Sequence, residues 1–122
     1  MPAVSTTTKT DWVDGNNDVI VSATPVRIMA IETQGNPTAT TDCYIRLWNS
    51  ANATPGTTEP DEVVYVPRPN VKDGKIKQKT ILGGKRFDTG LTMGVYTTPH
   101  SGSTSVVAAA APLSVKIFYA PA

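Results

Sequence analysis

The chain has 122 residues, and its 11 basic and 10 acidic side chains leave a formal net charge of +1. This length fits one domain with a modest core, and the near-neutral charge argues against a nucleic-acid binder that depends on overall positive charge. The single cysteine, Cys43, excludes an intramolecular disulfide and a thiolate metal cluster. No apolar run reaches the roughly 18 residues of a membrane-spanning helix.

The apolar residues follow the period of strands and not that of helices. No window sustains a stripe of apolar residues at the helical spacing i, i+3, i+4 and i+7, and ten prolines are spread along the chain. Since proline removes a helical hydrogen bond and clashes with the preceding turn, it would interrupt almost any long helix. The composition therefore predicts an all-β protein.

Residues 1–18 are polar and rich in threonine, which predicts an extended N-terminal arm. Trp12 and Val13 form an apolar pair within it, and they either attach the arm to its own domain or anchor it on a neighbouring subunit. The run DGNND at 14–18 lacks the spaced acidic residues and closing glutamate of a calcium-binding loop, so we expect a turn. The arm begins without the charged and apolar segments of a secretory signal.

Residues 19–122 predict one domain of six to eight short strands. The turn signals recur every 8 to 15 residues, which is typical of an antiparallel β-sandwich or jelly roll. Gly83-Gly84 is predicted to form a turn, and no helix is expected. The strands are expected at 19–22, 26–32, 42–48, 62–67, 72–82, 85–98 and 112–120.

The segment 42–60 shows the clearest alternation in the chain. Its strand has two different faces and is followed by a loop of small residues that contains Pro55 and Gly56. We expect one face to be core, with the cysteine as a small buried hydrophobe, and we expect Tyr44 and Trp48 on the other face to meet a neighbouring molecule. The inward face carries Cys43, Ile45 and Leu47, and the outward face carries Tyr44, Arg46 and Trp48.

Two later segments supply the other predicted core positions. In the predicted strands at 85–98 and 112–120, alternation places apolar residues on one face of the strand. These positions are Phe87, Leu91, Met93, Val95, Leu113, Val115, Ile117 and Tyr119.

Seven basic residues lie within the nineteen positions from 68 to 86, and Asp73 is the one acidic residue in this segment. Alternate lysines in 75–79 suit an exposed edge strand, where lysine discourages unwanted strand pairing. The segment is either a solvated edge or a docking surface, which would bind an acidic protein or mediate self-assembly with acidic neighbours. Nucleic-acid binding is a weaker third hypothesis because few aromatic residues accompany the lysines. The basic residues are Arg68, Lys72, Lys75, Lys77, Lys79, Lys85 and Arg86.

No pattern in the chain predicts a catalytic, metal or cofactor site. His100 lies among hydroxyl residues, but there is no Gly-x-Ser-x-Gly elbow, and one histidine with one cysteine is a poor zinc set. Asp61 and Glu62 are adjacent and would face opposite sides of a strand, unlike the paired carboxylates of a glycosidase. The sequon at Asn52 is expected to be a chance match. We therefore predict that the protein is not an enzyme.

Three segments resemble small all-β structural proteins of tailed-phage virions. They are YIRLWNSA at 44–51, which runs into TPGTTEP at 54–60, FDTGL at 87–91, and SVKIFYA at 114–120. Together the resemblance covers roughly residues 25–120. The lysine-rich segment 72–86 departs from the family pattern, in which a more neutral stretch with glycine is expected.

The resemblance implies a capsid decoration or cement protein. Such a protein is made in the host cytoplasm, binds the major capsid protein on the outer capsid surface as a homo-oligomer, and uses no cofactor, nucleic acid or membrane. A neck, tail or baseplate component is the alternative within this class. A carbohydrate-binding β-sandwich with a Tyr44–Trp48 platform is the alternative from another class. The residues expected to contact a partner are Trp12, Tyr44, Trp48, Lys75, Lys77, Lys79, Lys85 and Arg86.

Overall fold

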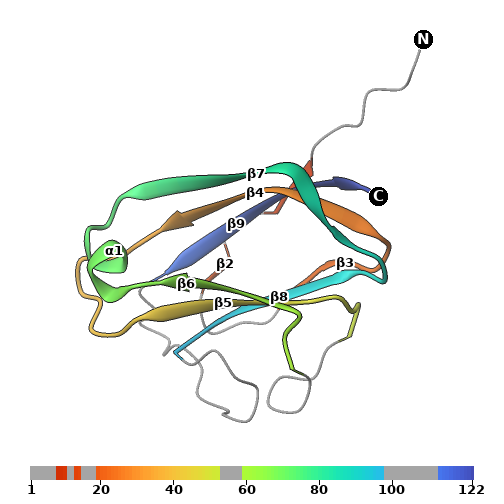
Figure 1. Ribbon diagram of the computed structural model, residues 1–122. Coiled ribbons are helices and arrows are strands. Elements are labelled where there is room, and N and C mark those ends of the chain that lie inside the picture. The colour runs from red at the N-terminus through yellow and green to blue at the C-terminus, as the bar shows by residue number, and fades with distance from the viewer. Residues whose placement is uncertain (1–7, 11–12, 15–18, 53–58, 98–112) are drawn as a thin grey trace.

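The computed structural model describes residues 8–10, 13–14, 19–52, 59–97 and 113–122, and these form an all-β structure (Figure 1). Trp12, residues 15–18 of the predicted turn, Pro55, Gly56 and His100 lie outside the described residues. The elements are β1 (Thr8–Lys9), β2 (Val13–Asp14), β3 (Val19–Ser22), β4 (Val26–Gln34), β5 (Cys43–Trp48), β6 (Glu62–Val66), α1 (Arg68–Lys72), β7 (Ile76–Phe87), β8 (Leu91–Tyr96) and β9 (Ser114–Pro121).

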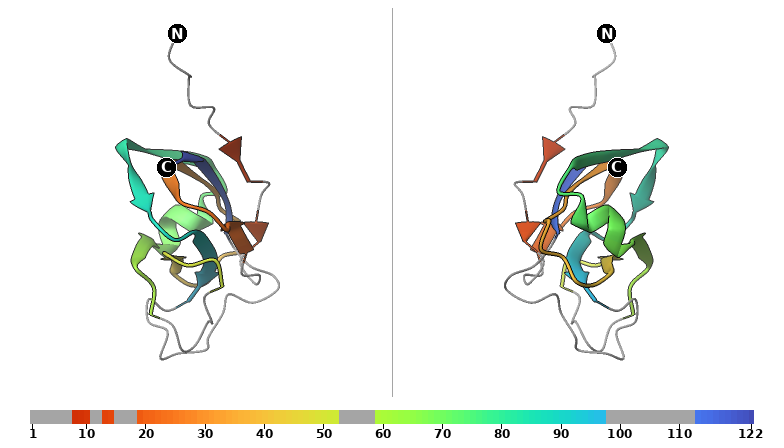
Figure 2. Two further views of the ribbon diagram at one scale, coloured as in Figure 1. Left: turned by 90° about the vertical axis from the view of Figure 1, so that its right-hand side faces the viewer. Right: turned by 90° about the vertical axis from the view of Figure 1, so that its left-hand side faces the viewer.

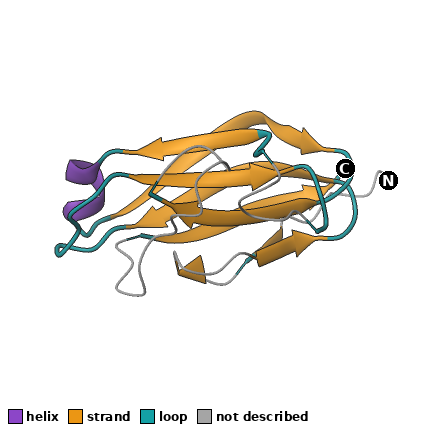
Figure 3. Ribbon diagram, turned by 90° about the horizontal axis from the view of Figure 1, so that it is seen from below, coloured by secondary structure: helices purple, strands orange, loops and turns teal. Residues whose placement is uncertain are grey.

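The described strands form two antiparallel sheets. One sheet has the order β1-β9-β4-β7, with β2 also paired to β9, and the other has the order β3-β8-β5-β6. The pairing is nested: the arm strands pair with β9, β3 with β8, β4 with β7, and β5 with β6. The strands run side by side along the molecule, with α1 at one end (Figure 3).

A single hydrophobic core joins the two sheets, which form separate layers when the molecule is viewed from its ends (Figure 2). The inward face predicted for β5 is confirmed, because Cys43, Ile45 and Leu47 are all buried. The later core positions are also confirmed, with Tyr119 packed against the core as a partly buried residue. The buried members from the later segments are Phe87, Leu91, Met93, Val95, Leu113, Val115 and Ile117.

The predicted turn at Gly83-Gly84 is wrong, because β7 continues through both glycines to Phe87. Thr80 lies opposite Ala30 and Lys85 lies opposite Ile28, so residues 81–84 face a single residue of β4. The excursion is a bulge and not a reversal. Gly84 has a φ of 74°, a left-handed conformation that glycine adopts without the steric penalty of a side chain.

The expectation of no helix is also wrong, since α1 spans five residues between β6 and β7. Prolines at the start of a helix are well tolerated, because the first helical N–H groups have no partner within the helix. The Arg68 N–H donates to Asp42 Oδ1 at 2.7 Å, and the Asn36 N–H donates to the Val71 carbonyl at 2.8 Å. A helix of this length is too short to show a helical apolar period in the sequence.

The described part of the N-terminal arm lies on its own domain. The backbone of β1 and β2 pairs with β9, and the Thr10 N–H donates to the Ile117 carbonyl at 3.0 Å. The Ile117 N–H donates in turn to Thr10 Oγ1, also at 3.0 Å. These contacts extend the five-stranded sheet beyond β9.

Candidate functional site

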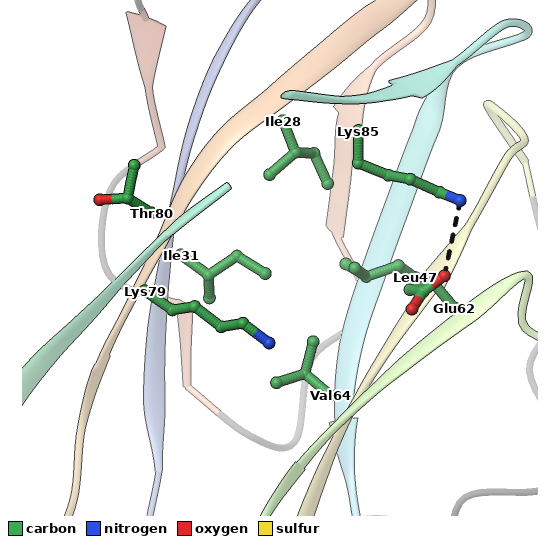
Figure 4. A pocket seen from close by; sticks show the side chains of 8 residues that line it. All are labelled: Ile28, Ile31, Leu47, Glu62, Val64, Lys79, Thr80 and Lys85. Carbon is green, nitrogen blue, oxygen red and sulfur yellow. Dashed lines mark ion pairs between the residues drawn. The ribbon is translucent and has the colours of Figure 1, made fainter. Parts of the chain in front are cut away.

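A groove opens between β6 and β7, which are the edge strands of the two sheets in the described part of the chain. Its larger hollow has a volume of about 430 Å³ (Figure 4). A smaller hollow of about 170 Å³ shares Ile31, Val64 and Lys79 with the first, so the two adjoin. We call this pair of hollows the edge groove; the larger one is lined by Ile28, Ile31, Leu47, Glu62, Val64, Lys79, Thr80 and Lys85.

The edge groove has an apolar floor and a charged rim. Ile28 of β4 and Leu47 of β5 belong to the core, and Val64 of β6 packs against it. At the rim, Lys85 Nζ lies 3.7 Å from Glu62 Oε2, and Figure 4 shows the Lys79 side chain directed across the groove toward Val64. Because the Lys85 and Glu62 side chains are about half exposed, this ion pair adds little stability.

The lysines of β7 face the interior side of the sheet. Lys79 lies opposite Ile31, Lys77 opposite Thr33, and Lys85 opposite Ile28. Residues directly opposite in a ladder share one face, so these side chains lie on the face that carries the core residues of β4. Their aliphatic stems can cover apolar surface while the ammonium groups reach water.

The prediction that this lysine segment is an exposed edge strand is confirmed, and its members differ in position. Lys75 precedes β7, and Arg86 lies opposite Arg27 and pairs with Asp88. Lys77 contacts Asp73 and donates to the Asn70 carbonyl at 3.4 Å. The hydrogen bond from Lys77 is the main reason that the pKa of Asp73 lies below its ordinary value. The structure therefore brings Lys77, Lys79 and Lys85 together at the groove.

The outer face of β5 is not an exposed aromatic pair. Tyr44 and Trp48 share that face as predicted, but Trp48 is 0% exposed, so the expectation that its ring meets a neighbour is wrong. The Trp48 ring lies edge-on to Tyr96 at a centroid distance of 6.0 Å, and Arg46 Cζ lies 3.9 Å from the Tyr96 ring centroid. Burial on both faces of β5 was not visible in its alternating pattern.

Tyr44 instead stacks on Tyr65, with their ring centroids 5.1 Å apart. Tyr65 is 53% exposed and lies opposite Tyr44 on the neighbouring strand β6. Tyr65 was not among the predicted contact residues, although the alternation in Glu62–Val66 places it on the face opposite Val64. Among the described residues of this face, Tyr65 is therefore the exposed aromatic side chain, and the partly buried Tyr44 stacks on it.

The described residues contain no group of three or more histidine, cysteine, aspartate or glutamate side chains that could hold a metal ion. Burial, with a smaller contribution from the charge of Asp42, raises the pKa of the Cys43 thiol to about 11. The thiol is accordingly protonated and inaccessible at neutral pH. None of the described helices is long and apolar enough to cross a membrane.

Comparisons of the chain with protein-family models, with curated protein sequences and with solved structures find no match. Among the described residues, the candidate binding site is the edge groove, which is lined by Lys77, Lys79 and Lys85.

Proposed function

We propose that this chain is a structural protein of a phage virion that acts by binding, as a capsid decoration or cement protein. Its partner would be the major capsid protein on the outer shell. A protein that binds only the assembled shell stabilises that state by mass action, and several copies would multiply weak contacts by avidity. In this proposal the chain has no catalytic role.

The observation that carries the proposal is where the resembling segments lie in the fold. The segment 44–51 begins in β5, 87–91 joins β7 to β8, and 114–120 lies in β9. Phe87, Leu91 and Ile117 from these segments are all core residues. The segments are thus framework, which supports a shared fold with such virion proteins. Three lysines of the lysine-rich departure, Lys77, Lys79 and Lys85, line the edge groove, where a protein with its own docking partner would differ.

We further infer that the two sheets form a β-sandwich of the jelly-roll type. If β1 and β2 count as one strand, the first strand pairs with the last, the second with the second-last, and so on inward. Such nesting is what a long hairpin rolled into two sheets produces, and jelly rolls occur in viral capsid and lectin domains. This topology supports the virion proposal without distinguishing it from a lectin.

Binding to purified shells tests the proposed function. Purified protein is mixed with expanded empty shells or with free capsid subunit, and bound protein is measured after sedimentation. We expect saturable binding to shells and no binding to free subunit. We also expect shells that lack the protein to open at a lower temperature. An equal opening temperature with and without the protein would contradict the bracing role.

The location of the protein in a purified particle decides between head and tail. Labelling by antibody in electron micrographs, with the copy number from quantitative mass spectrometry, should place many copies on the shell. A few copies at the neck or baseplate would favour the alternative within the same class.

A carbohydrate-binding module is the second candidate, because Tyr44 and Tyr65 form a stacked aromatic pair with Tyr65 exposed. Aromatic faces of this kind suit the apolar faces of sugar rings. Glycan-array binding by the isolated protein that is lost in Tyr65→Ala would favour this candidate over the virion role.

A further inference from the structure

We propose that the edge groove receives an extended acidic segment of a partner protein, which pairs as an added strand with the edge of β7 that faces away from β4. The inference deepens the proposed function by naming the partner's chemistry, and only the identity of that partner as the capsid protein rests on the proposed function.

The backbone of β7 offers a suitable edge. Among the described strands β7 pairs only with β4, and residues Ile76–Thr80 pair in unbroken register with Ala30–Gln34. The outer side of this stretch therefore has backbone N–H and C=O groups that face away from β4. An extended peptide satisfies such groups by β-strand addition, and its alternate side chains then provide specificity.

The charge at this edge favours an acidic partner. Cross-strand neighbours interact directly, so a strand added to β7 would place side chains beside the interior-facing Lys77 and Lys79. Lys79 lines both hollows and has no ion pair among the described residues. A carboxylate beside Lys79 would gain a charge-assisted hydrogen bond.

The same lysines disfavour a second copy of this chain as the occupant. Pairing β7 with its own equivalent would bring lysine close to lysine across the ladder, and like charges directly opposite are destabilising. The β7 edge therefore disfavours pairing with β7 of a second copy and favours a strand of opposite charge. Such a difference in affinity is the basis of specificity at interfaces.

The larger hollow adds a position for an apolar side chain. It lies between Lys79 and Lys85, where β7 bulges and the floor is formed by Ile28, Leu47 and Val64. The interior-facing residues of an added strand would therefore be acidic beside Lys77, acidic beside Lys79, and apolar over the hollow. The occupant is expected to carry an apolar–x–acidic–x–acidic pattern, in the chain direction that fits this register.

Binding of designed peptides to the full chain tests this inference. The probe is a fluorescein-labelled peptide Leu-Thr-Glu-Thr-Glu-Thr, together with the same composition in reversed order, and binding is measured by fluorescence anisotropy. We expect saturable binding of one of these peptides. We expect no binding of versions in which lysine replaces glutamate or proline replaces threonine, because the first removes the charge match and the second prevents strand pairing.

Two charge-matched variants separate the groove from general attraction to a basic protein. Lys79→Glu should weaken peptide binding by about tenfold or more, since it replaces an attraction with a repulsion. Lys72→Glu makes the same charge change at an exposed helix residue that does not line the groove, and should have less than about a twofold effect. Circular dichroism of both variants verifies that they are folded, and Lys79→Gln supplies a milder second variant.

Amide hydrogen exchange locates the bound peptide. We expect new protection in Ile76–Thr80. Equal weakening by the two glutamate variants, binding of the lysine peptide, or protection elsewhere would overturn the inference. If the protein binds shells but not the peptides, the inference about the edge groove is refuted and the proposed function stands. If the protein binds a peptide but not shells, the capsid role is refuted and the inference about the groove stands.

Discussion

Arg46 is a charged residue whose side chain is 0% exposed on the outer face of β5. Its neighbours across the ladder are Gly94 of β8 and Val63 of β6. Since Gly94 has no side chain, there is space above it for the Arg46 guanidinium and the Trp48 ring, and both contact Tyr96. The contact of Arg46 with the Tyr96 ring is a cation–π interaction in a buried setting, where such contacts are strongest.

Truncation of Arg46 should therefore destabilise the fold. Arg46→Ala leaves a cavity and removes the cation–π contact, and we expect it to lower the free energy of unfolding by about 2–4 kcal/mol. Arg46→Met keeps most of the volume without a buried charge, and should lower it by about 1 kcal/mol or less. Urea denaturation of both variants measures this. An equal loss in both would mean that the charge, and not the packed volume, provides the stability.

The buried thiol of Cys43 should make stability depend on alkaline pH. Its pKa is raised from 9.0 to about 11, so between these values the unfolded chain loses the proton while the native thiol keeps it. The contribution of the buried thiol to the free energy of unfolding is thus complete below pH 9 and is lost as pH rises toward 11. The loss should amount to about 2–3 kcal/mol. Urea denaturation from pH 8 to 11 should show a smaller decline in Cys43→Ala than in the unmodified chain. Parallel declines would contradict this.

At the scale of elements, the junction of β4 with α1 sets one end of the edge groove. A Cβ on Gly35 would lie 1.9 Å from the Val71 carbonyl oxygen, which is a backbone atom that cannot move aside as a side chain can. The close approach lets the Asn36 N–H reach the same carbonyl. Because α1 leads directly into β7, this contact helps to place the lysine edge.

Gly35 and Gly74 should respond differently to substitution. Gly35→Ala forces backbone apart and should destabilise by about 3 kcal/mol. Gly74→Ala should cost about 1–2 kcal/mol, because Gly74 has a φ of 68° but its Cβ would meet only Pro37 at 3.2 Å. Gly74→Asn should be milder still, since asparagine tolerates the left-handed region. Thermal and urea unfolding measure the free energy of unfolding of each variant. A larger loss in Gly74→Ala than in Gly35→Ala would contradict this prediction.

At the scale of the whole molecule, the arm completes the outer edge of the five-stranded sheet. Without β1 and β2, strand β9 would pair only with β4 among the described strands and would present a free edge. Unpaired strand edges are less protected and more prone to association.

A chain of residues 19–122 should therefore fold with reduced stability. We expect a loss of about 2–4 kcal/mol, from a few backbone hydrogen bonds worth about 0.5–1.5 kcal/mol each. We also expect faster amide exchange in 115–119, where the Ile117 N–H loses Thr10 as acceptor. If residues 19–122 are as stable as the full chain, the arm does not stabilise the fold. If residues 19–122 do not fold, the arm is an essential part of the domain.

The all-β class, the inward face of β5 and most core positions of β8 and β9 were predictable from the amino-acid sequence, because alternating apolar residues there mark the strand face that packs in the core. The alternate lysines at 75–79 also predicted an exposed edge strand, because lysine at an edge discourages pairing with a further strand, and β7 is an edge of its sheet among the described strands. These are local signals that each strand carries alone.

The other features depend on contacts between segments that are distant in the sequence. The burial of Arg46 and Trp48 depends on what lies over the outer face, and alternation cannot show whether a second face is covered. The continuation of β7 through its double glycine depends on β4 pairing with both halves, and α1 is too short to leave a periodic signal. The edge groove exists because β6 and β7, which belong to different sheets, border the same opening. Its lysines were visible in the sequence, but the apolar floor beneath them comes from β4, β5 and β6, and only folding brings those strands together.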